Sequence, residues 1–491
     1  MGLLLGIDIG TSSSKAIVMD ERGNCISTGL SLYDINIPSP NFAEQDAQML
    51  WRSVCSAVSS AVSQDSTIKD NIVAIGVTGQ MHGIVSLDVN MNPIRPVIIW
   101  ADQRSGKQIR ELRKTDLDQR VGNLASTGFL YSSLLWIKEN EPENYALIHK
   151  VLLPKDYIRY RICKEIGTDY SDASGTLLFN IHSNSWDTKE LRRQGIPEEI
   201  MPQIFHSSEI AGFTRKEFCL CTGLAEGIPV VYGGGDTPMQ LAANGIVEKG
   251  MLGLNIGTSS QINCISNRPV NSDNRLSLFR HVCDDLWIEA GASLNGGIIL
   301  KWLKQKVFFN KIDYPEMDVR ASKSVPGANG IVFLPFLCGE RSPYLNEDAV
   351  GILYGLKLSN NENDIIRAAM ESVVFSFKDC MEVYKEIQLP MQDYIIASGG
   401  GSSSSIWRQI QADILQKVIR VSTDKELAAK GAAISAGVGC GLFSSFQEGC
   451  KATAHLSDEV YEPNNALADI YHEKFEIYRS LYKNNKELFS L

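Results

Sequence analysis

The sequence contains one nine-residue pattern twice, half a chain length apart. Leu5–Ser13 reads LGIDIGTSS and Leu252–Ser260 reads LGLNIGTSS. The offset between Gly6 and Gly253 is 253 − 6 = 247, in a chain of 491 residues. In each copy a short apolar run ends in a Gly-Thr-Ser-Ser turn, as a buried strand does before it reverses. The repeat predicts two copies of one domain, fused head to tail, that form two lobes around a cleft.

The residues around the first copy predict an α/β fold. Apolar residues resume directly after the turn at Ala16–Met19, which favours a hairpin, and Cys25–Leu30 follows as a third strand. After Asp46, apolar residues recur at helical spacing, namely Leu50, Val54, Ala57, Val58 and Ala61. Further strands are expected near 71–77, 84–87 and 96–100. Strands that alternate with helices in this way indicate an α/β sheet.

Charge and composition exclude several classes of protein. Lys and Arg total 47 against 57 Asp and Glu, a net charge of −10 without a dense basic tract, so nucleic acid is not an expected partner. No run of about 18 apolar residues predicts a membrane span, and the start MGLLLGIDIG lacks a basic signal region. The 11 Cys are scattered, and the closest pair, Cys219 and Cys221, fits neither a redox nor a zinc motif. A reducing, cytoplasmic environment is expected.

Both copies of the repeated turn could hold phosphate. Gly10, Thr11 and Ser12 offer closely spaced backbone N–H groups and hydroxyls, and Gly257 with Thr258 offers the same in the second copy. A single turn of this kind could simply close a hairpin. Two turns that face one another could bind a polyphosphate.

The two copies differ at one informative position. Asp8 in the first copy is replaced by Asn255 in the second. One carboxylate near a phosphate chain suits Mg²⁺ that bridges phosphate oxygens, whereas a second would add repulsion. Asp8 is therefore the candidate metal ligand.

Two further glycine-rich turns follow apolar strands. Ser398–Gly401 precedes a helix expected over 406–417, so Gly400 and Gly401 could let a ligand approach the backbone closely, although a flexible loop has the same composition. Gly233–Gly235 carries Asp236. That carboxylate either caps the helix that begins near Pro238 or acts as a general base that accepts a proton from a substrate hydroxyl.

Taken together, these segments resemble the FGGY carbohydrate kinases. The matching segments follow one another along nearly the whole chain: Gly6–Ser12, Gly79–Gly83, Trp100–Arg104, Leu152–Tyr157, Ser171–Thr176, Gly233–Asp236, Asn255–Ser260, Gly339–Pro343, Gly351–Leu356 and Ser398–Gly401. The resemblance implies a duplicated ribonuclease-H-like, actin-like ATPase fold. It also implies a sugar-binding lobe over 1–243 with the first phosphate turn, and a nucleotide-binding lobe over 244–491.

The resemblance assigns roles to particular residues. It implies transfer of the ATP γ-phosphoryl group to a sugar hydroxyl, with Asp236 as base and Asp8 as the residue that orients Mg²⁺. Met81 and His82 would contact the sugar; phosphate and adenosine would meet the glycine-rich turns, through Gly10, Thr11, Ser12, Gly257, Thr258, Gly400 and Gly401. A homodimer is the expected assembly.

The substrate branch is less sharply defined. Gly79–Gly83 and Trp100–Arg104 are similar to the xylulokinase branch and imply D-xylulose, whereas Ala292–Gly297 is similar to sedoheptulokinases; ribulokinase-like and gluconokinase-like substrates stay open. Two positions depart from the pattern: Ser133 stands where the family signature has Lys, and Thr237 where xylulokinases have Asn. The rival from another class is a non-metabolic ATPase of the actin or chaperone type, which the first turn alone would also fit.

Overall fold

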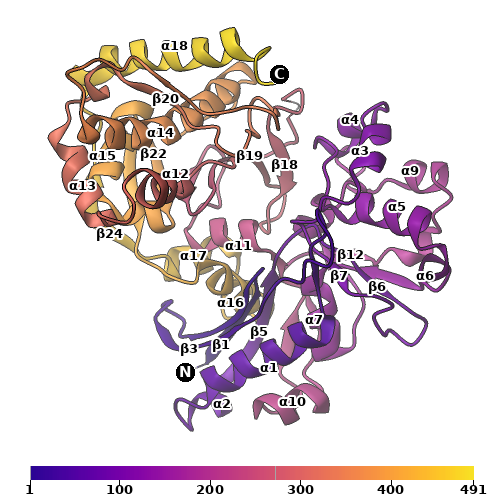
Figure 1. Ribbon diagram of the computed structural model, residues 1–491. Helices are drawn as coiled ribbons and strands as arrows, with labels where there is room; N and C mark the ends of the chain where they lie inside the picture. Colours follow the sequence, from indigo (N-terminus) through magenta and orange to yellow (C-terminus); the bar gives the residue numbers. More distant parts are fainter. Residues whose placement is uncertain (1, 271, 491) are drawn as a thin grey trace.

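The computed structural model describes residues 2–270 and 272–490, which form two lobes that each contain a seven-stranded mixed sheet (Figure 1). The first sheet consists of β1 (Leu3–Ile9), β2 (Ser13–Met19), β3 (Cys25–Leu32), β5 (Ile72–Gly79), β13 (Ile210–Phe213), β14 (Pro229–Val231) and β15 (Gly234–Gly235). The second consists of β16 (Leu252–Ile256), β17 (Ser260–Ser266), β18 (Ser277–Arg280), β19 (Trp287–Ser293), β22 (Tyr394–Ser398), β23 (Val418–Ser422) and β24 (Leu456–Tyr461).

The two sheets share one topology. The order β3-β2-β1-β5-β14-β13 in the first corresponds to β19-β17-β16-β22-β23-β24 in the second. In both, the repeated strand pairs antiparallel with the next strand along the chain and parallel with a later one, as β1 does with β2 and β5, and β16 with β17 and β22. The predicted hairpin and the duplicated α/β fold are confirmed.

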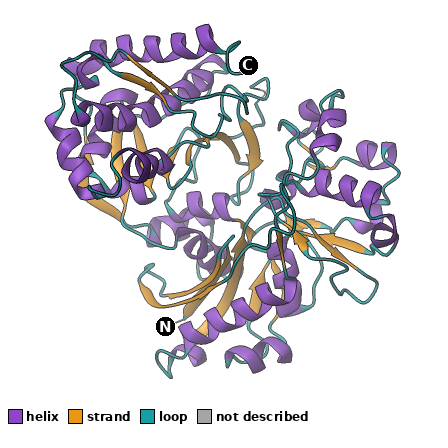
Figure 2. Cartoon of the chain, in the orientation of Figure 1, coloured by secondary structure: helices purple, strands orange, loops and turns teal. Residues whose placement is uncertain are grey.

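Helices flank the strands of both lobes (Figure 2). Those beside the first sheet are α1 (Ala47–Val62), α2 (Ile68–Asn71), α7 (Pro154–Cys163), α10 (Lys216–Thr222) and α11 (Asp236–Ala243). Those of the second lobe are α12 (Gly297–Trp302), α13 (Tyr314–Lys323), α14 (Glu362–Glu386), α15 (Ser405–Leu415), α17 (Phe446–Thr453) and α18 (Ala468–Asn485). The helix predicted over 406–417 corresponds to α15, with small shifts of its bounds.

One helix from the second half of the sequence packs on the first sheet. Helix α16 (Leu427–Gly439) lies against β1 and β5 because both surfaces are made of small residues. A Cβ on Gly6 would lie 1.8 Å from the carbonyl oxygen of Ala429, and a Cβ on Gly76 equally close to that of Ala432. The lobes are therefore interlocked, and their predicted division at residue 243 stays a prediction.

A long insertion between β5 and β13 extends the first lobe. Its helices are α3 (Gly106–Leu112), α4 (Leu117–Val121), α5 (Leu130–Asn140), α6 (Pro142–Ala146), α8 (Tyr170–Ser174) and α9 (Thr188–Arg193), and among its short strands are β6 (Val85–Leu87) and β9 (Thr168–Asp169). Strand β18 of the second lobe docks on it, since Asn123 exchanges two hydrogen bonds with the backbone of Leu278, at 2.7 and 3.0 Å. This contact joins the lobes near the predicted sugar segment.

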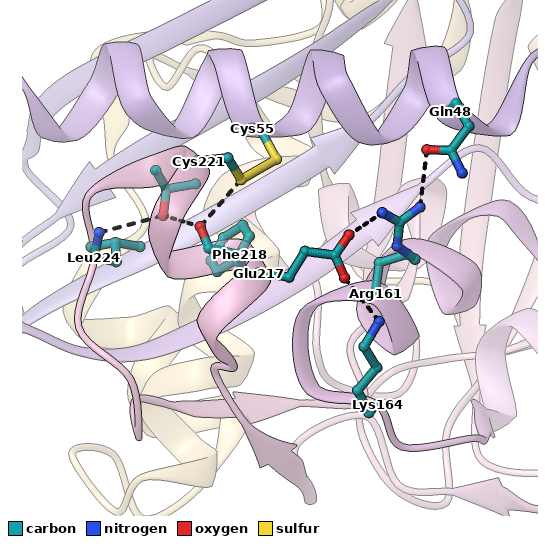
Figure 3. Close-up of a disulfide and its surroundings, with 9 residues drawn as sticks. Gln48, Cys55, Arg161, Lys164, Glu217, Phe218, Cys221 and Leu224 are labelled. Carbon is teal, nitrogen blue, oxygen red and sulfur yellow. Dashed lines mark hydrogen bonds and ion pairs between the residues drawn. A yellow bond between two sulfur atoms is a disulfide. The ribbon is translucent and has the colours of Figure 1, made fainter.

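Cys55 and Cys221 form a disulfide that joins α1 to α10 (Figure 3). Beside it, Arg161 of α7 bonds Gln48 of α1 and pairs with Glu217 of α10. These links fasten α1, α7 and α10 together. The scattered cysteines had indicated a reducing environment, and this pairing is a finding that their spacing did not predict. Within residues 2–270 and 272–490, no helix combines the length and apolarity needed to cross a membrane.

Candidate functional site

The fold brings the predicted site residues to one sheet edge. Strand β5 pairs in parallel with β1 on one side and with β15 on the other, so all three end at the same edge. Asp8 and Gly234 both pair with Thr78 of β5, from opposite sides. Asp236 follows β15 directly, and Met81 and His82 follow β5. The predicted base, metal ligand and sugar contacts therefore lie together at the carboxyl ends of parallel strands, where α/β sheets bind ligands.

Asp8 is a carboxyl group without a counter-charge of its own. Its Oδ1 is buried and has no hydrogen-bond partner among the described residues. Burial, together with the negative charge of Asp236, raises the pKa of Asp8 to about 7, although Lys15 lowers it. Lys15 itself pairs with Glu426 at 2.6 Å, so it does not neutralise Asp8 outright. An unpartnered oxygen of this kind is ready for a cation.

Asp236 begins helix α11 and does not cap it from outside, since Gly235 occupies the N-cap position. Its Oδ1 accepts the backbone N–H of Thr237 at 2.7 Å, and no described residue donates to Oδ2. Burial raises the pKa of Asp236 to about 6, although the Thr237 amide and hydroxyl lower it. One oxygen is thus fixed, and the other is left to accept a proton.

The first phosphate turn is held so that its amides face outward. The carbonyl of Gly10 accepts from Tyr33 Oη at 2.6 Å, and that of Thr11 from Gln45 Nε2 at 2.7 Å. The carbonyl of Ser12 accepts the backbone N–H of Tyr33. In contrast, the amides of Thr11 and Ser12 have no acceptor within the described part of the chain. Occupied carbonyls and free N–H groups are what an anion-binding turn requires, and phosphate binding by this turn stays a prediction.

The second turn lies beside the third glycine-rich turn. The carbonyls of Gly257 and Thr258 accept the backbone N–H groups of Gly297 and Ile298, at 2.8 and 3.0 Å. Asn255 Nδ2 donates to Ser398 Oγ across the parallel pair β16 and β22, at 3.1 Å. The two turns therefore share one edge, as the first-lobe residues do.

Gly400 and Gly401 serve different purposes. A Cβ on Gly401 would lie 2.6 Å from Cβ of Ile256, so this glycine lets the turn pack on β16. Gly400 is exposed, and its nearest neighbour at the Cβ position is 4.0 Å away. Gly400 can therefore face a ligand, whereas Gly401 is needed for packing; adenosine binding by either stays a prediction.

A polar hollow lies between the loop Tyr232–Asp236, here called the catalytic loop, and the second turn. It is lined by Thr237 and Gln240 of α11, by Asn244, which caps that helix, and by side chains of the second sheet that include Asn255, Gln261, Asn263 and Ser398. The Oδ1 atoms of Asn244 and Asn263 have no hydrogen-bond partner within the described residues. The hollow thus joins Thr237, next to the predicted base, with Asn255, next to the second phosphate turn.

Met81 and His82 lie beside the catalytic loop. Met81 is buried, and a Cβ on Gly235 would lie 2.9 Å from its sulfur. His82 Nδ1 lies 2.7 Å from the carbonyl oxygen of Gly175, which can only accept, so Nδ1 carries the proton. Burial lowers the pKa of His82 to about 4, so the ring is neutral near pH 7 and presents Nε2 as an acceptor. His82 has a structural hydrogen bond and one ring nitrogen free for a sugar hydroxyl.

Trp100, which belongs to a segment that implies sugar specificity, contacts the first phosphate turn. Its Nε1 donates to Thr11 Oγ1 at 2.9 Å, so the indole holds the hydroxyl that was predicted to meet phosphate. Ser133, where the family pattern has Lys, is buried on α5, and its hydroxyl has no partner in the described chain. The contact of the usual lysine is therefore not replaced by the serine.

Sequence reasoning missed a buried charged cluster beneath the catalytic loop. It comprises Lys155, Asp156, Arg159, Asp169 and Asp172, all with fully buried side chains. Three of these lie within the segments Leu152–Tyr157 and Ser171–Thr176, which carried the resemblance without an assigned role. The sequence signal that could have revealed the cluster is the pair Lys155 and Asp156, which directly follows the apolar run Val151–Pro154.

The donor set fits Mg²⁺ held largely by phosphate. Among the described residues no three His, Cys, Asp or Glu side chains come together as a metal cage. Magnesium typically binds one or two carboxylates together with phosphate oxygens and water. The unpartnered Oδ1 of Asp8 is such a carboxylate, and Asn255 offers no second charge.

Comparison with known proteins agrees with this geometry. Residues 3–243 match the N-terminal domain of the FGGY family of carbohydrate kinases, and residues 252–440 match its C-terminal domain. The chain is 33% identical to a xylulose kinase of Staphylococcus epidermidis over 99% of this chain and 97% of that protein. It is 30% identical to a xylulose kinase of Escherichia coli, covering 98% and 99%.

Solved structures agree as well. A crystal structure titled as a xyloylose kinase from Brucella ovis superposes with a TM-score of 0.93 at 28% identity, over 99% of this chain and all of that one. The actin or chaperone rival fails because it accounts for neither the C-terminal domain match nor these relatives. The order of the motifs, the duplicated sheets and the matches over both halves lead to one conclusion: the chain belongs to the FGGY family of carbohydrate kinases.

Proposed function

We propose that this sugar kinase phosphorylates an open-chain ketose, with D-xylulose as its best common substrate and D-xylulose 5-phosphate as product. Kinases of the family use ATP as the phosphate donor. The observation that supports the proposal most is the free Oδ2 of Asp236, beside Met81 and His82 at one sheet edge. The curated relatives named xylulose kinase support the choice of sugar.

The side chains then take the following roles. Asp236 Oδ2 accepts the proton of the attacking hydroxyl, while Met81 and His82 Nε2 orient the sugar. The free amides of Thr11 and Ser12, with the turn at Gly257 and Thr258, bind phosphate oxygens. Mg²⁺, held by Asp8 and by phosphate, supplies neutralisation of the charge on the transferred group. The protein contributes positioning and exclusion of water.

The proposed base predicts the pH dependence of turnover. A general base works only when ionised, and burial raises the pKa of Asp236 to about 6. We therefore expect kcat to be constant above pH 7 and to fall as the pH drops through about 6. Initial rates at saturating sugar and ATP-Mg²⁺ between pH 5 and 8 measure this. A fall centred near pH 4 would contradict the role of a buried base.

A panel of sugars tests the substrate. We expect the highest kcat/KM for D-xylulose among D-xylulose, L-xylulose, D-ribulose, sedoheptulose, gluconate and glycerol. Glycerol should be poor by orders of magnitude, because a site built for several hydroxyls leaves its polar groups unpaired when a small polyol binds. ADP release with ATP and Mg²⁺ is the measurement. Sedoheptulose in first place would select the alternative branch, and glycerol in first place would refute both.

Thr237 offers a sharper version of the same test. Asn at this position could both donate and accept a hydrogen bond, whereas the shorter threonine lines the polar hollow beside Asp236. If the missing amide is what separates this chain from other xylulokinases, Thr237→Asn raises kcat/KM for D-xylulose relative to the other sugars. A loss for every sugar would mean that Thr237, whose hydroxyl lies 3.4 Å from Asp236 Oδ1, and Pro238 set the backbone that aims Asp236.

Two finer predictions concern the protein as a whole. A cytoplasmic location fits a kinase that uses ATP and a metabolic sugar. A homodimer is the proposed assembly, and the mass in solution from light scattering tests it directly, since a monomer would give about 54.2 kDa.

A further inference from the structure

The buried charged cluster beneath the catalytic loop needs an explanation. Lys155 Nζ lies 2.7 Å from Asp169 Oδ1, 3.0 Å from Asp156 Oδ1 and 3.3 Å from Asp172 Oδ2. Arg159 adds a second cation, 3.6 Å from Asp156. Charges removed from water are costly, and apolar residues could fill the same volume at lower cost. Such a cluster is therefore retained for what it positions.

The cluster has no net charge if one of its carboxyl groups is protonated. Two cations face three carboxyl groups, so one carboxyl group is in excess. Burial raises the pKa of Asp172 well above its usual value, although Lys155 opposes this. Burial disfavours the charge of Lys155, but Asp156, Asp169 and Asp172 raise its pKa above the usual value. A protonated Asp172 leaves the cluster neutral, and Asp169 is the carboxyl group that lies nearest to Lys155, at 2.7 Å.

The cluster holds both sides of the loop that carries Asp236. On one side, Lys155 Nζ donates to the carbonyl of Tyr232 at 3.2 Å. On the other, Asp169 Oδ2 accepts from Ser171 Oγ at 2.5 Å, and Ser171 Oγ accepts the backbone N–H of Gly235 at 3.0 Å. Because the serine hydroxyl donates to the carboxylate, a lone pair faces Gly235. The residue after Gly235 is Asp236.

The loop between these two points cannot take another shape easily. Gly233 has φ +74°, and a Cβ there would lie 1.8 Å from the carbonyl oxygen of Val77. A side chain is therefore excluded, and the loop passes tightly over β5. The bonds at Tyr232 and Gly235 hold the two ends of the segment that leads into α11.

We propose that Ser171, oriented by the Lys155–Asp169 ion pair, is a positioning residue that aims Asp236 at the sugar hydroxyl. The inference rests on the proposed role of Asp236 as general base. Ser171 does not touch the reacting atoms. It fixes the peptide group that precedes Asp236, and so acts on turnover through the geometry of the base.

Ser207 provides a matched control. Its Oγ donates to the same atom, Asp169 Oδ2, at 3.0 Å, and both serines are buried. Ser207 contacts the loop only through its backbone, since its carbonyl accepts the N–H of Gly233 at 2.9 Å. Alanine at 207 removes the bond to Asp169 but keeps this backbone contact. The two variants thus differ in the bond to Gly235.

The test compares Ser171→Ala with Ser207→Ala in the intact chain. We expect Ser171→Ala to lower kcat by about 10-fold or more, since small displacements of a catalytic group are costly, with KM for sugar and for ATP within about twofold of the wild type. Ser207→Ala should keep kcat within about twofold. Thermal unfolding of both variants shows whether each is folded and how far the two losses of stability agree.

The outcomes distinguish a failure of the positioning role of Ser171 from a failure of the proposed role of Asp236 as base. Equal kcat in both serine variants, whether normal or reduced, overturns the positioning role. A rise in KM at unchanged kcat in Ser171→Ala overturns it as well, because ground-state binding would then be affected. Asp236→Asn is measured in parallel: if that variant keeps full turnover, the proposed base is wrong; if it is inactive while the serine variants behave alike, only the positioning role fails.

Discussion

Replacing Asp236 by Asn is expected to lower kcat by about 10²-fold or more, the scale of general-base catalysis, while sugar and ATP still bind. The amide has the shape of the carboxylate and can still accept the Thr237 N–H through its oxygen. It cannot accept a proton at the position of Oδ2. Steady-state kinetics at saturating sugar and ATP-Mg²⁺ measure the loss, and calorimetric titration of the sugar measures binding.

Asn244→Ala is a suitable control for this substitution. Asn244 is the C-cap residue of the same helix, α11, and lines the polar hollow, yet its Oδ1 has no partner in the described residues. Its removal changes the helix without touching the base, so kcat should fall far less than in Asp236→Asn. Full turnover of Asp236→Asn at saturating sugar would show that another group accepts the proton.

The repeated pattern was sufficient to predict two copies of one α/β domain because it encodes local structure twice, whereas the ribonuclease-H-like fold was implied by the family resemblance. An apolar run, a Gly-Thr-Ser-Ser turn and a second apolar run specify a hairpin within about 15 residues, and parallel pairing with a later strand completes the edge. The substitution of Asp8 by Asn255 between copies then distinguished the two turns. The local pattern of a carboxylate after three glycines also singled out Asp236, but it left a helix cap and a general base open, and only the resemblance favoured the base.

Features that depend on distant contacts could not be predicted in this way. Cys55 and Cys221 are 166 residues apart, and only the packing of α1 beside α10 brings them together. Ser171 and Gly235 are likewise joined by tertiary structure and not by any spacing. The interlocking of α16 with the first sheet follows from small residues at Gly6 and Gly76, whose meaning appears only when Ala429 and Ala432 face them.

The asymmetry of the two phosphate turns predicts opposite results for two reciprocal substitutions. Asp8→Asn should lower Mg²⁺-dependent kcat by about 10²-fold, because the carboxylate that orients the metal and neutralises charge is lost. Asn255→Asp should instead weaken ATP binding by about 10-fold, because it adds a negative charge near phosphate. Kinetics across Mg²⁺ concentrations and nucleotide titration measure the two effects. Equal tolerance of both changes would contradict two turns that share one phosphate chain.

Asp8→Asn also carries a stability signature that distinguishes lost function from lost folding. Burial raises the pKa of Asp8 from 3.8 to about 7, so the folded state favours the protonated acid. Its ionised form costs stability, and this cost develops as the pH rises from about 4 through 7. Without ligands, Asp8→Asn should therefore raise Tm at pH 8 by at least about 2 °C and change it little at pH 4. If the variant is inactive, yet more stable than the wild type at pH 8 alone, the charge of Asp8 serves function and lowers the stability of the fold. If the variant is less stable at both pH values, Asp8 supports the strand edge instead.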